Sequence, residues 1–199
     1  MKRVLIFAAI CLSTSSLSAQ DIQLPTPQKT GGKPLMEAIN LRQSNRTFVD
    51  KDLDNQTLAN LMWSAYGFNR NDKRVVPSAN NKQEFSVFIA LKSGVYLYDA
   101  SANKLIQRLK GDHRSEFGKQ DFVAKASANL AYVADLDKAD GNMARIDCGF
   151  IAQNVYLFCA SSGLSTVARG YFDQAELKKL LNLDDKQEVI LCQSVGFSK

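Results

Sequence analysis

The stretch PSANNKQ at residues 77–83 stands directly before Phe85 to Leu91, an apolar run with the length and composition of a buried β-strand. Its carboxamide side chains can both donate and accept hydrogen bonds, which suits a heterocyclic ligand with donors and acceptors of its own. Asn and Ser also favour turns, so the stretch taken alone is equally compatible with turn formation. The candidate ligand-binding residues in it are Ser78, Asn80, Asn81 and Gln83.

A second stretch, RQSNR at residues 42–46, follows a short segment that predicts a helix. Because Arg42, Ser44 and Arg46 alternate, an extended or turn backbone places all three side chains on one side. Two guanidinium groups and a hydroxyl suit the phosphate monoester of a ligand. Taken alone, the stretch is more simply explained as a solvated helix end that carries cations.

A third stretch, SGLSTVARG at residues 162–170, follows the most apolar segment of the chain. It predicts the end of a helix, then a short strand, then a glycine at which a ligand can approach the backbone closely. An ordinary connection between a helix and a strand is the alternative interpretation. The candidate residues here are Ala168, Arg169 and Gly170.

In this order, the three stretches resemble those of the FMN-dependent nitroreductase family, and the resemblance extends from residue 35 to the C-terminus. It implies that Arg42, Ser44 and Arg46 hold the FMN phosphate and pyrimidine edge, and that the amides of residues 77–83 contact the flavin. It also implies that backbone N–H groups at residues 168–170 approach flavin N5 and O4.

Two positions depart from the family pattern. Arg169 stands where the family usually has Glu, which preserves a backbone contact but alters the local charge. The chain ends soon after Val195-Gly196, whereas many members continue with basic residues that reach the phosphate. Lys199 is therefore the one candidate for that role in the tail.

The elements predicted from periodicity and capping residues are mixed along the chain. Helices are predicted at 35–41, 54–66, 112–127, 146–162 and 173–181, and strands at 85–91, 95–98, 104–109, 130–136, 164–168 and 188–195. There is no regular βαβ repetition, which predicts an α+β fold. The resemblance implies a mixed or antiparallel sheet flanked by helices, in an intertwined homodimer with FMN at the subunit interface. The apolar helix around residues 151–159 suits such an interface.

The N-terminal residues 1–20 have the order of a secretory signal peptide, with a basic start, a short apolar run and a small-residue end near Ala19. We therefore expect export to the periplasm or medium. Cys11 leaves a lipoprotein as a minor alternative. Residues 21–34 read as an extended leader, so the FMN-binding domain is predicted at 35–199. The apolar run is too short to anchor the chain in a bilayer, so no integral membrane association is expected.

The net charge and the distribution of basic residues argue against nucleic-acid binding. The formal charge is +5, and it falls to +3 if residues 1–20 are removed, because Lys2 and Arg3 are lost with no acid. No run of Lys and Arg interleaved with aromatics is present, so nucleic-acid binding is not expected. A modest positive charge suits an anionic cofactor equally well.

Reactive side chains are scarce. His113, the one histidine, lies in a charged stretch and reads as a surface residue. Cys148 and Cys159 are about 16 Å apart along a predicted helix, which excludes a disulfide between them. A bridge from Cys192 to either stays possible in an oxidising compartment, although buried free thiols are favoured. No metal-ligand spacing is present. If the protein is an enzyme, its reactive group comes from a cofactor and no side chain is expected to be catalytic.

The resemblance implies an FMN oxidoreductase that passes hydride or electrons from a small reduced donor, through flavin N5, to an electron-poor acceptor such as a quinone or a nitroaromatic. The family branch that oxidises thiazoline and oxazoline rings in peptides matches the compact length. An exported flavin- or anion-binding protein without turnover is the alternative, which Arg169 and the short tail favour. A third possibility is an interaction module that has kept the fold and lost the cofactor.

Overall fold

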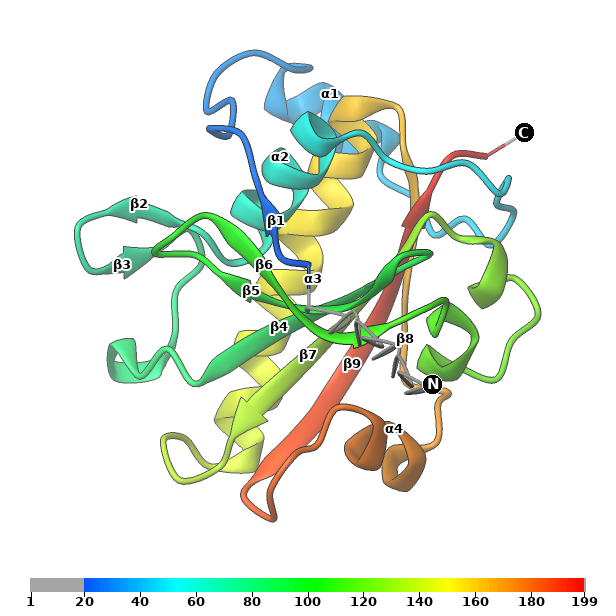
Figure 1. Cartoon of the computed structure of the whole chain (residues 1–199). Helices are drawn as coiled ribbons and strands as arrows, with labels where there is room; N and C mark the ends of the chain where they lie inside the picture. The colour runs from blue at the N-terminus through cyan, green and yellow to red at the C-terminus, as the bar shows by residue number, and fades with distance from the viewer. Residues whose placement is uncertain (1–19, 199) are drawn as a thin grey trace, which may run out of the picture.

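The computed structural model describes residues 20–198, which form a seven-stranded sheet with helices on both faces (Figure 1). The strand order is β1-β6-β5-β4-β7-β9-β8, and every neighbouring pair is antiparallel. The strands are β1 Ile22–Gln23, β4 Phe85–Leu91, β5 Gly94–Asp99, β6 Lys104–Lys110, β7 Ala128–Asp135, β8 Ser165–Arg169 and β9 Gln187–Gly196. A separate hairpin joins β2 Phe68–Arg70 to β3 Lys73–Arg74.

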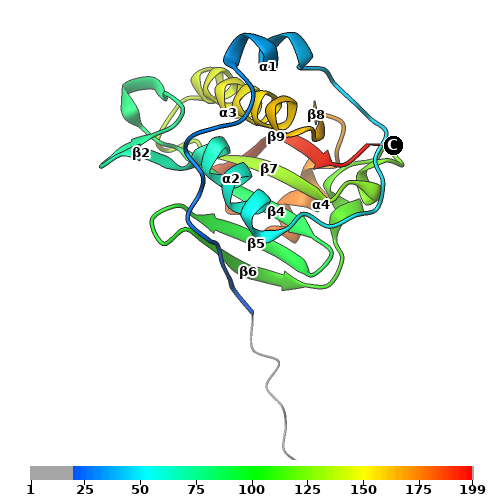
Figure 2. The same cartoon turned by 90° about the horizontal axis from the view of Figure 1, so that it is seen from above.

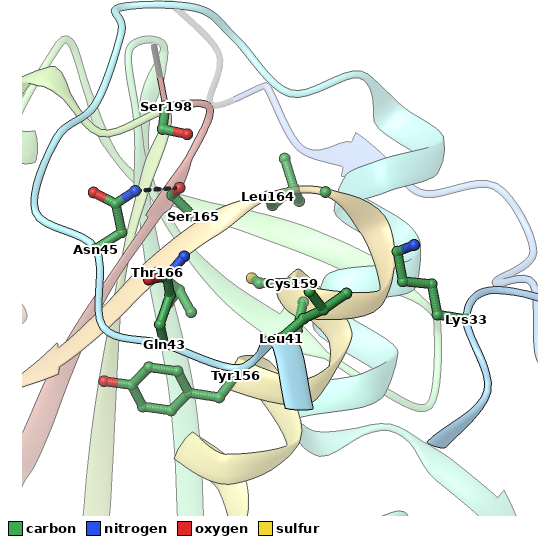
Figure 3. A pocket seen from close by; sticks show the side chains of 12 residues that line it. Lys33, Leu41, Gln43, Asn45, Tyr156, Cys159, Leu164, Ser165, Thr166 and Ser198 are labelled. Carbon is green, nitrogen blue, oxygen red and sulfur yellow. Dashed lines mark hydrogen bonds between the residues drawn. The ribbon is translucent and has the colours of Figure 1, made fainter. Parts of the chain in front are cut away.

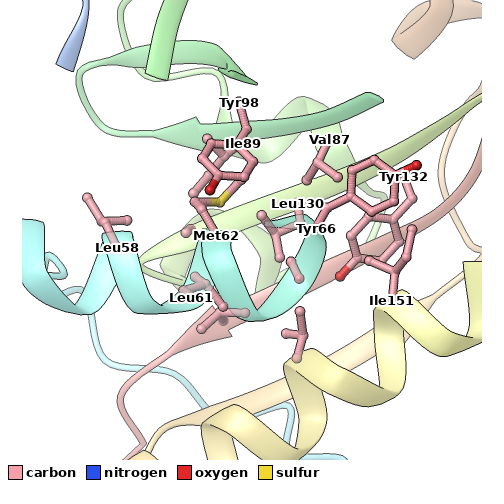
Figure 4. Packing of buried hydrophobic residues seen from close by; sticks show 14 of the residues in the cluster. Leu58, Leu61, Met62, Tyr66, Val87, Ile89, Tyr98, Leu130, Tyr132 and Ile151 are labelled. Carbon is pink, nitrogen blue, oxygen red and sulfur yellow. The ribbon is translucent and has the colours of Figure 1, made fainter. Parts of the chain in front are cut away.

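The helices are α1 Leu35–Leu41, α2 Asn55–Tyr66, α3 Gly141–Ser162 and α4 Gln174–Leu180, with 3-10 helices η1 Ala79–Asn81, η2 Arg114–Phe117 and η3 Val123–Lys125. The sheet separates two apolar clusters, because successive strand side chains point to opposite faces. Val87 and Ile89 of β4 pack with α2 and α3, whereas Phe88 and Ala90 pack with α4, η2 and η3. Figure 4 shows the larger cluster, in which Met62 of α2 and Ile151 of α3 meet the sheet.

Local signals set the helix ends. The carboxylate of Asp54 accepts the Thr57 N–H at 2.7 Å at the start of α2, and Gly67 caps its end. Asp140 caps α3 in the same way, which is why this helix begins five residues before the predicted start at residue 146. Gly163 ends α3 in the left-handed conformation, with φ of 72°. These caps confirm the predicted helices, with α3 extended.

The predicted helix at 112–127 is wrong, since only η2 and η3 form there. The physical reason is that buried side chains, one from within the segment and two from outside it, bind the carbonyl groups that a helix would use. Arg169 donates to the Phe117 carbonyl, Arg114 donates to that of Ala126, and Asn129 donates to that of Val123. A continuous helix would leave these buried donors without partners.

Helix α3 has one buried face rather than the all-round burial that its composition predicts. Its buried side chains include Cys148, Ile151 and Val155, but Ile146 and Phe150 are 54% and 41% exposed. Helix α1 lies beside α3, on the side away from the strands (Figure 2). Between residues 20 and 198, no helix has the length and apolar character needed to cross a membrane.

The cysteines of the described region confirm the interpretation of buried free thiols. Cys148, Cys159 and Cys192 are all buried and unpaired. Burial raises the pKa of each thiol, so all three stay protonated at neutral pH. The predicted signal peptide, residues 1–20, lies outside the described residues except for Gln20, and so does Lys199.

Candidate functional site

The RQSNR segment, residues 42–46, lies along β8 at the edge of the sheet. The Asn45 backbone N–H donates to the Thr166 carbonyl at 3.0 Å, and the Asn45 side chain donates to Ser165 Oγ at 3.0 Å (Figure 3). These bonds hold the segment extended, so that side chains alternate along it as predicted. The segment is therefore fixed to the fold through Asn45, which sequence reasoning did not single out.

Tyr156 of α3 joins the RQSNR segment to β8. Its hydroxyl oxygen lies 2.8 Å from Ser44 Oγ and accepts the Ala168 backbone N–H at 2.9 Å. The Arg42 guanidinium carbon lies 5.3 Å from the centre of the Tyr156 ring, close enough for a cation–π contact. The structure thus brings Arg42, Ser44 and Ala168 together, with the Ala168 N–H bonded to Tyr156 within the protomer. The one signal for Tyr156 in the sequence is a hydroxyl within a largely apolar segment.

A pocket of about 260 Å³ opens between the RQSNR segment, the end of α3, the start of β8 and the end of the chain (Figure 3). Lys33, Asn45, Thr166 and Ser198 contribute polar groups to its wall, and Cys159 contributes a buried thiol. The strongly raised pKa of Cys159 excludes it as a nucleophile at neutral pH. The pocket can therefore bind a polar or charged group but has no reactive side chain of its own.

The two arginines of the segment are not neutralised by the rest of the protomer. Arg42 is half-buried and Arg46 is exposed. Within residues 20–198, neither guanidinium forms an ion pair or hydrogen bond with another residue. Both are thus available to an anion, and Ser44 lies between them.

The PSANNKQ loop, residues 77–83, is held in a strained conformation. Asn80, Asn81 and Gln83 have φ values of 51°, 56° and 48°, in the left-handed region. Ser78 Oγ accepts the Gln83 backbone N–H at 2.9 Å, which closes the loop. Strain of this kind persists only where surrounding contacts impose it, and it is frequent in loops that clamp ligands.

The Gln83 side chain is already engaged within the protomer. Its oxygen accepts from Arg74 Nε at 3.0 Å, and its nitrogen donates to the Asp72 carbonyl at 2.6 Å. The Arg74 guanidinium is stacked near the rings of Tyr66 and Phe68, at 4.3 and 3.9 Å from their centres. Gln83 therefore supports the loop from the β2–β3 hairpin, while Asn80 and Asn81 remain exposed.

One protomer does not bring the two polar stretches together. The Ala79 N–H donates to Asp147 of α3 at 2.8 Å, so the PSANNKQ loop is attached near the start of that helix. Tyr156, which anchors Ser44, is nine residues further on, about 13 Å along the axis. A ligand that touches both loops must span this distance or sit between two copies of the chain.

Arg169 does not alter the charge at the site, contrary to the expectation from the sequence. Its side chain is only 7% exposed and points into the fold, where it donates to Ser194 Oγ at 3.1 Å and to Asn129 Oδ1 at 3.0 Å. Alternation along β8 explains this, because Ala168 and Arg169 face opposite sides. Gly170 is exposed, and no atom lies within 4 Å of the position that a Cβ would take there.

Comparison with known proteins identifies this arrangement. The model of the family described as the nitroreductase family matches residues 39–197. A crystal structure from Ralstonia eutropha JMP134, provisionally described as a nitroreductase, has 34% sequence identity and a TM-score of 0.84, over 90% of each chain. A provisionally named nitroreductase of Methanocaldococcus jannaschii is 26% identical over 88% of this chain and 96% of its own length.

A more distant neighbour carries a ligand. The structure of a provisionally named nitroreductase from Desulfovibrio desulfuricans in complex with FMN has a TM-score of 0.64 and 16% identity, over 84% of this chain and 88% of that one. At that identity it supports the fold alone. The family model spans most of the chain, and the Ralstonia structure agrees with it over nearly the full length of both proteins. The chain therefore belongs to the nitroreductase family.

Proposed function

We propose that the protein is an FMN-dependent oxidoreductase that passes electrons from a small reduced donor to an electron-poor acceptor of the quinone or nitroaromatic type. Family membership supports the class of reaction and the cofactor, and the Desulfovibrio neighbour shows that a protein of this fold binds FMN. The observation that carries the proposal is the pair of arginines without acidic partners, Arg42 and Arg46, on either side of the Ser44 hydroxyl.

These residues fit an FMN phosphate in number and chemistry. A phosphate monoester offers several acceptor oxygens, and Arg42, Arg46 and Ser44 offer donors on one side of an extended segment. Lys33 in the wall of the adjoining pocket is paired with Glu37 at 2.7 Å and is not counted among these donors. Tyr156 holds Ser44 in place, so the hydroxyl is oriented before the ligand arrives.

A flat ring has room beside the end of β8. Gly170 is open to solvent and carries no side chain, so a ligand can approach its backbone closely. Asn80 and Asn81 are the exposed amides that the PSANNKQ loop can offer to the hydrogen-bonding edge of such a ring. The side chain of Arg169 takes no part, because it is buried on the other side of β8.

We further propose that a second copy of the chain completes the site. Large apolar side chains of α1 and α3 are exposed in one protomer: Leu35, Met36, Ile39, Leu41, Ile146 and Phe150. An apolar surface of this kind suits a homodimer interface. A two-fold axis beside α3 would place the partner's PSANNKQ loop near the RQSNR segment, which the separation along α3 prevents within one protomer.

Bound FMN would supply the redox chemistry, since it accepts electrons from a donor and returns them to an acceptor. The protein would bind the phosphate, orient the ring and hold a positive field nearby. No side-chain acid or base is assigned. His113 bonds to Glu116 and to the Lys110 carbonyl, at 2.9 and 3.0 Å, and lies on the η2 segment rather than at the site.

Export through the predicted signal peptide, residues 1–20, is part of the proposal and rests on the sequence pattern. An exported enzyme would require a reduced donor present outside the cytoplasm. Fractionation of cells that produce the full chain would test this point, because export predicts protein in the periplasm or medium that lacks the first 19 or 20 residues by mass.

The central experiment uses the absorbance spectrum of the purified chain. We expect a yellow protein that releases FMN on denaturation, is bleached by a reduced nicotinamide or another donor, and recovers its colour with a quinone. Bound FMN without any bleaching would select the alternative of a flavin-binding protein without turnover. Folded, colourless protein that ignores added FMN would overturn both.

A further inference from the structure

Glu84 is a buried carboxylic acid without a hydrogen-bond donor. It lies between the PSANNKQ loop and β4, and it is only 2% exposed. Both of its side-chain oxygens are buried, and neither has a donor partner among the described residues. Burying an unpaired carboxylate is costly, so this position requires an explanation.

The side chain that raises the pKa of Glu84 is a second acid, Asp147 of α3. Asp147 is 3% exposed, and its Oδ2 accepts the Ala79 N–H of the loop at 2.8 Å. Two ionised carboxylates can only accept hydrogen bonds, so they cannot bond to each other. One proton between them removes the repulsion and supplies the missing donor.

None of the neighbouring charged and titratable groups named below takes over this proton or neutralises the pair. Tyr66 of α2 uses its hydroxyl to accept the Phe85 N–H at 3.2 Å, and burial raises its pKa to about 12. Cys148 of α3 has a strongly raised pKa and is also neutral. Lys138 favours the charged form of Glu84, but its side chain is 54% exposed and pairs with Asp135.

Arg74 of β3 is the other cation on this side of the fold. Its guanidinium is stacked over the Tyr66 ring and donates to the Tyr66 carbonyl at 2.9 Å and to Gln83 at 3.0 Å. Burial is the largest cause that raises the pKa of Glu84, and the Asp147 carboxylate raises it further; the backbone N–H of Glu84 and the Lys138 ammonium act in the opposite direction but do not outweigh them.

We propose that Glu84 and Asp147 share one proton, that this proton fastens the PSANNKQ loop to α3, and that its loss to solvent weakens FMN binding. Glu84 directly follows Gln83 at the end of the loop, and Asp147 accepts the Ala79 N–H near its start. The pair therefore contacts the loop at two points. Loss of the proton would leave two buried negative charges facing each other. The repulsion would push the loop away from α3. Asn80 and Asn81, which belong to the loop, would be displaced with it.

The link to FMN rests on the proposed function, whereas the shared proton does not. Both residues are positioning residues, since they act through the loop. FMN binding would favour the closed, protonated loop, so affinity should fall as the pH rises. One proton is taken up with each FMN that binds. Well above the pKa of the pair, the FMN dissociation constant should therefore increase by about tenfold for each pH unit.

The first test is FMN affinity measured by flavin fluorescence across a pH series, in the wild-type chain and in Glu84→Gln. The amide of Gln can donate to Asp147 at every pH, so it mimics the protonated acid without titrating. We expect the wild-type dissociation constant to rise relative to that of Glu84→Gln as the pH increases. Titration of the FMN phosphate affects both proteins equally, so it does not change the ratio of their dissociation constants. Parallel curves would overturn the coupling of the proton to the loop.

The second test needs no FMN. The infrared spectrum of the apoprotein at neutral pH should contain the C=O stretching band of a buried protonated carboxylic acid, and Glu84→Gln should lack it. Asp147→Asn, in which the amide can donate to an ionised Glu84, should lack it as well. A wild-type spectrum without the band overturns the shared proton. A chain that shows the band but does not bind FMN would retain the shared proton while the proposed function fails.

Discussion

Ser44 and Tyr156 are 112 residues apart in the chain, yet their side-chain oxygens lie 2.8 Å apart. The same Tyr156 oxygen accepts the Ala168 N–H, so one hydroxyl joins a segment after α1 to the edge strand β8. The tyrosine oxygen can accept from Ala168 and donate its own proton to Ser44, which leaves the Ser44 hydroxyl free to donate outward. This junction fixes the donors that the proposed phosphate site requires.

Tyr156→Phe should weaken FMN binding without unfolding the protein. The substitution removes one acceptor and one donor at a half-buried position, a loss of about 1 kcal/mol, or roughly fivefold in affinity. Flavin fluorescence titration measures the effect. Tyr96→Phe removes a tyrosine hydroxyl of β5 that bonds Ser93, away from β8 in the strand order; it is the matched control and should bind FMN like the wild type. Equal affinity of the two variants would contradict the role of Tyr156.

Replacing both Arg42 and Arg46 with Ala should reduce FMN retention strongly. Each hydrogen bond between a guanidinium and the phosphate contributes about 1.5–3 kcal/mol, and no acid in the described protomer competes for either arginine. The ratio of flavin to protein absorbance after gel filtration reports occupancy. Arg108→Ala removes an exposed cation from β6, far from β8 in the strand order, and should retain full occupancy. Full occupancy in the double variant would exclude the phosphate assignment.

Arg169→Met should destabilise the fold while leaving the exposed surface of the site unchanged. The buried guanidinium donates to Asn129, Ser194 and the Phe117 carbonyl. Its removal leaves the Phe117 carbonyl without this donor, whereas Ser194 and Asn129 keep the hydrogen bond between them at 2.6 Å and each lose one bond to a charged group. Each unsatisfied buried group costs about 1–3 kcal/mol. Urea unfolding should show a lower midpoint than for the wild type, whereas Arg108→Ala should unfold at the wild-type midpoint. A stable Arg169→Met protein would show that these bonds are dispensable.

The stability of the chain should contain a pH-dependent contribution from Glu84. Because its folded pKa is raised above the ordinary 4.5, this contribution is fully present below pH 4.5 and is lost as the pH rises through the folded pKa. The free energy of unfolding measured at several pH values should therefore fall more steeply in the wild type than in Glu84→Gln. Carboxylates with a lowered pKa, such as Asp112 beside Arg114, make the free energy of unfolding increase with pH. They are present in both proteins, so they do not affect the difference between the two slopes. Identical slopes would contradict the prediction.

Phe150→Asp should separate the proposed homodimer into monomers and release FMN. Phe150 is 41% exposed on α3 within the apolar surface, and a carboxylate there would be buried without a partner in the interface. Sedimentation velocity measures the mass, and absorbance at the flavin band measures the cofactor in the same run. Arg108→Asp, at an exposed residue of β6 far from β8 and α3, should remain dimeric. A monomeric wild-type chain that binds FMN would exclude a site shared between subunits.

Much of the α+β fold could be predicted because its signals are local. The continuous apolar run of β4 and the caps at Asp54, Gly67 and Gly163 act within one or two turns of the chain. The helix predicted at 112–127 failed because its carbonyls are bound by Arg114 and by distant residues, which no local pattern reveals. The RQSNR and PSANNKQ stretches could likewise be found in the sequence, since residue type and spacing define them.

The sequence by itself determined the family, the positions of most elements and the residue types available to an anion. Tertiary structure alone decided that Tyr156 connects Ser44 to Ala168, that Arg169 faces inward, and that Glu84 meets Asp147. The physical reason is that hydrogen bonds and the desolvation of charge depend on which groups lie close together in space. In an antiparallel sheet with long connections, those groups come from segments far apart in the chain.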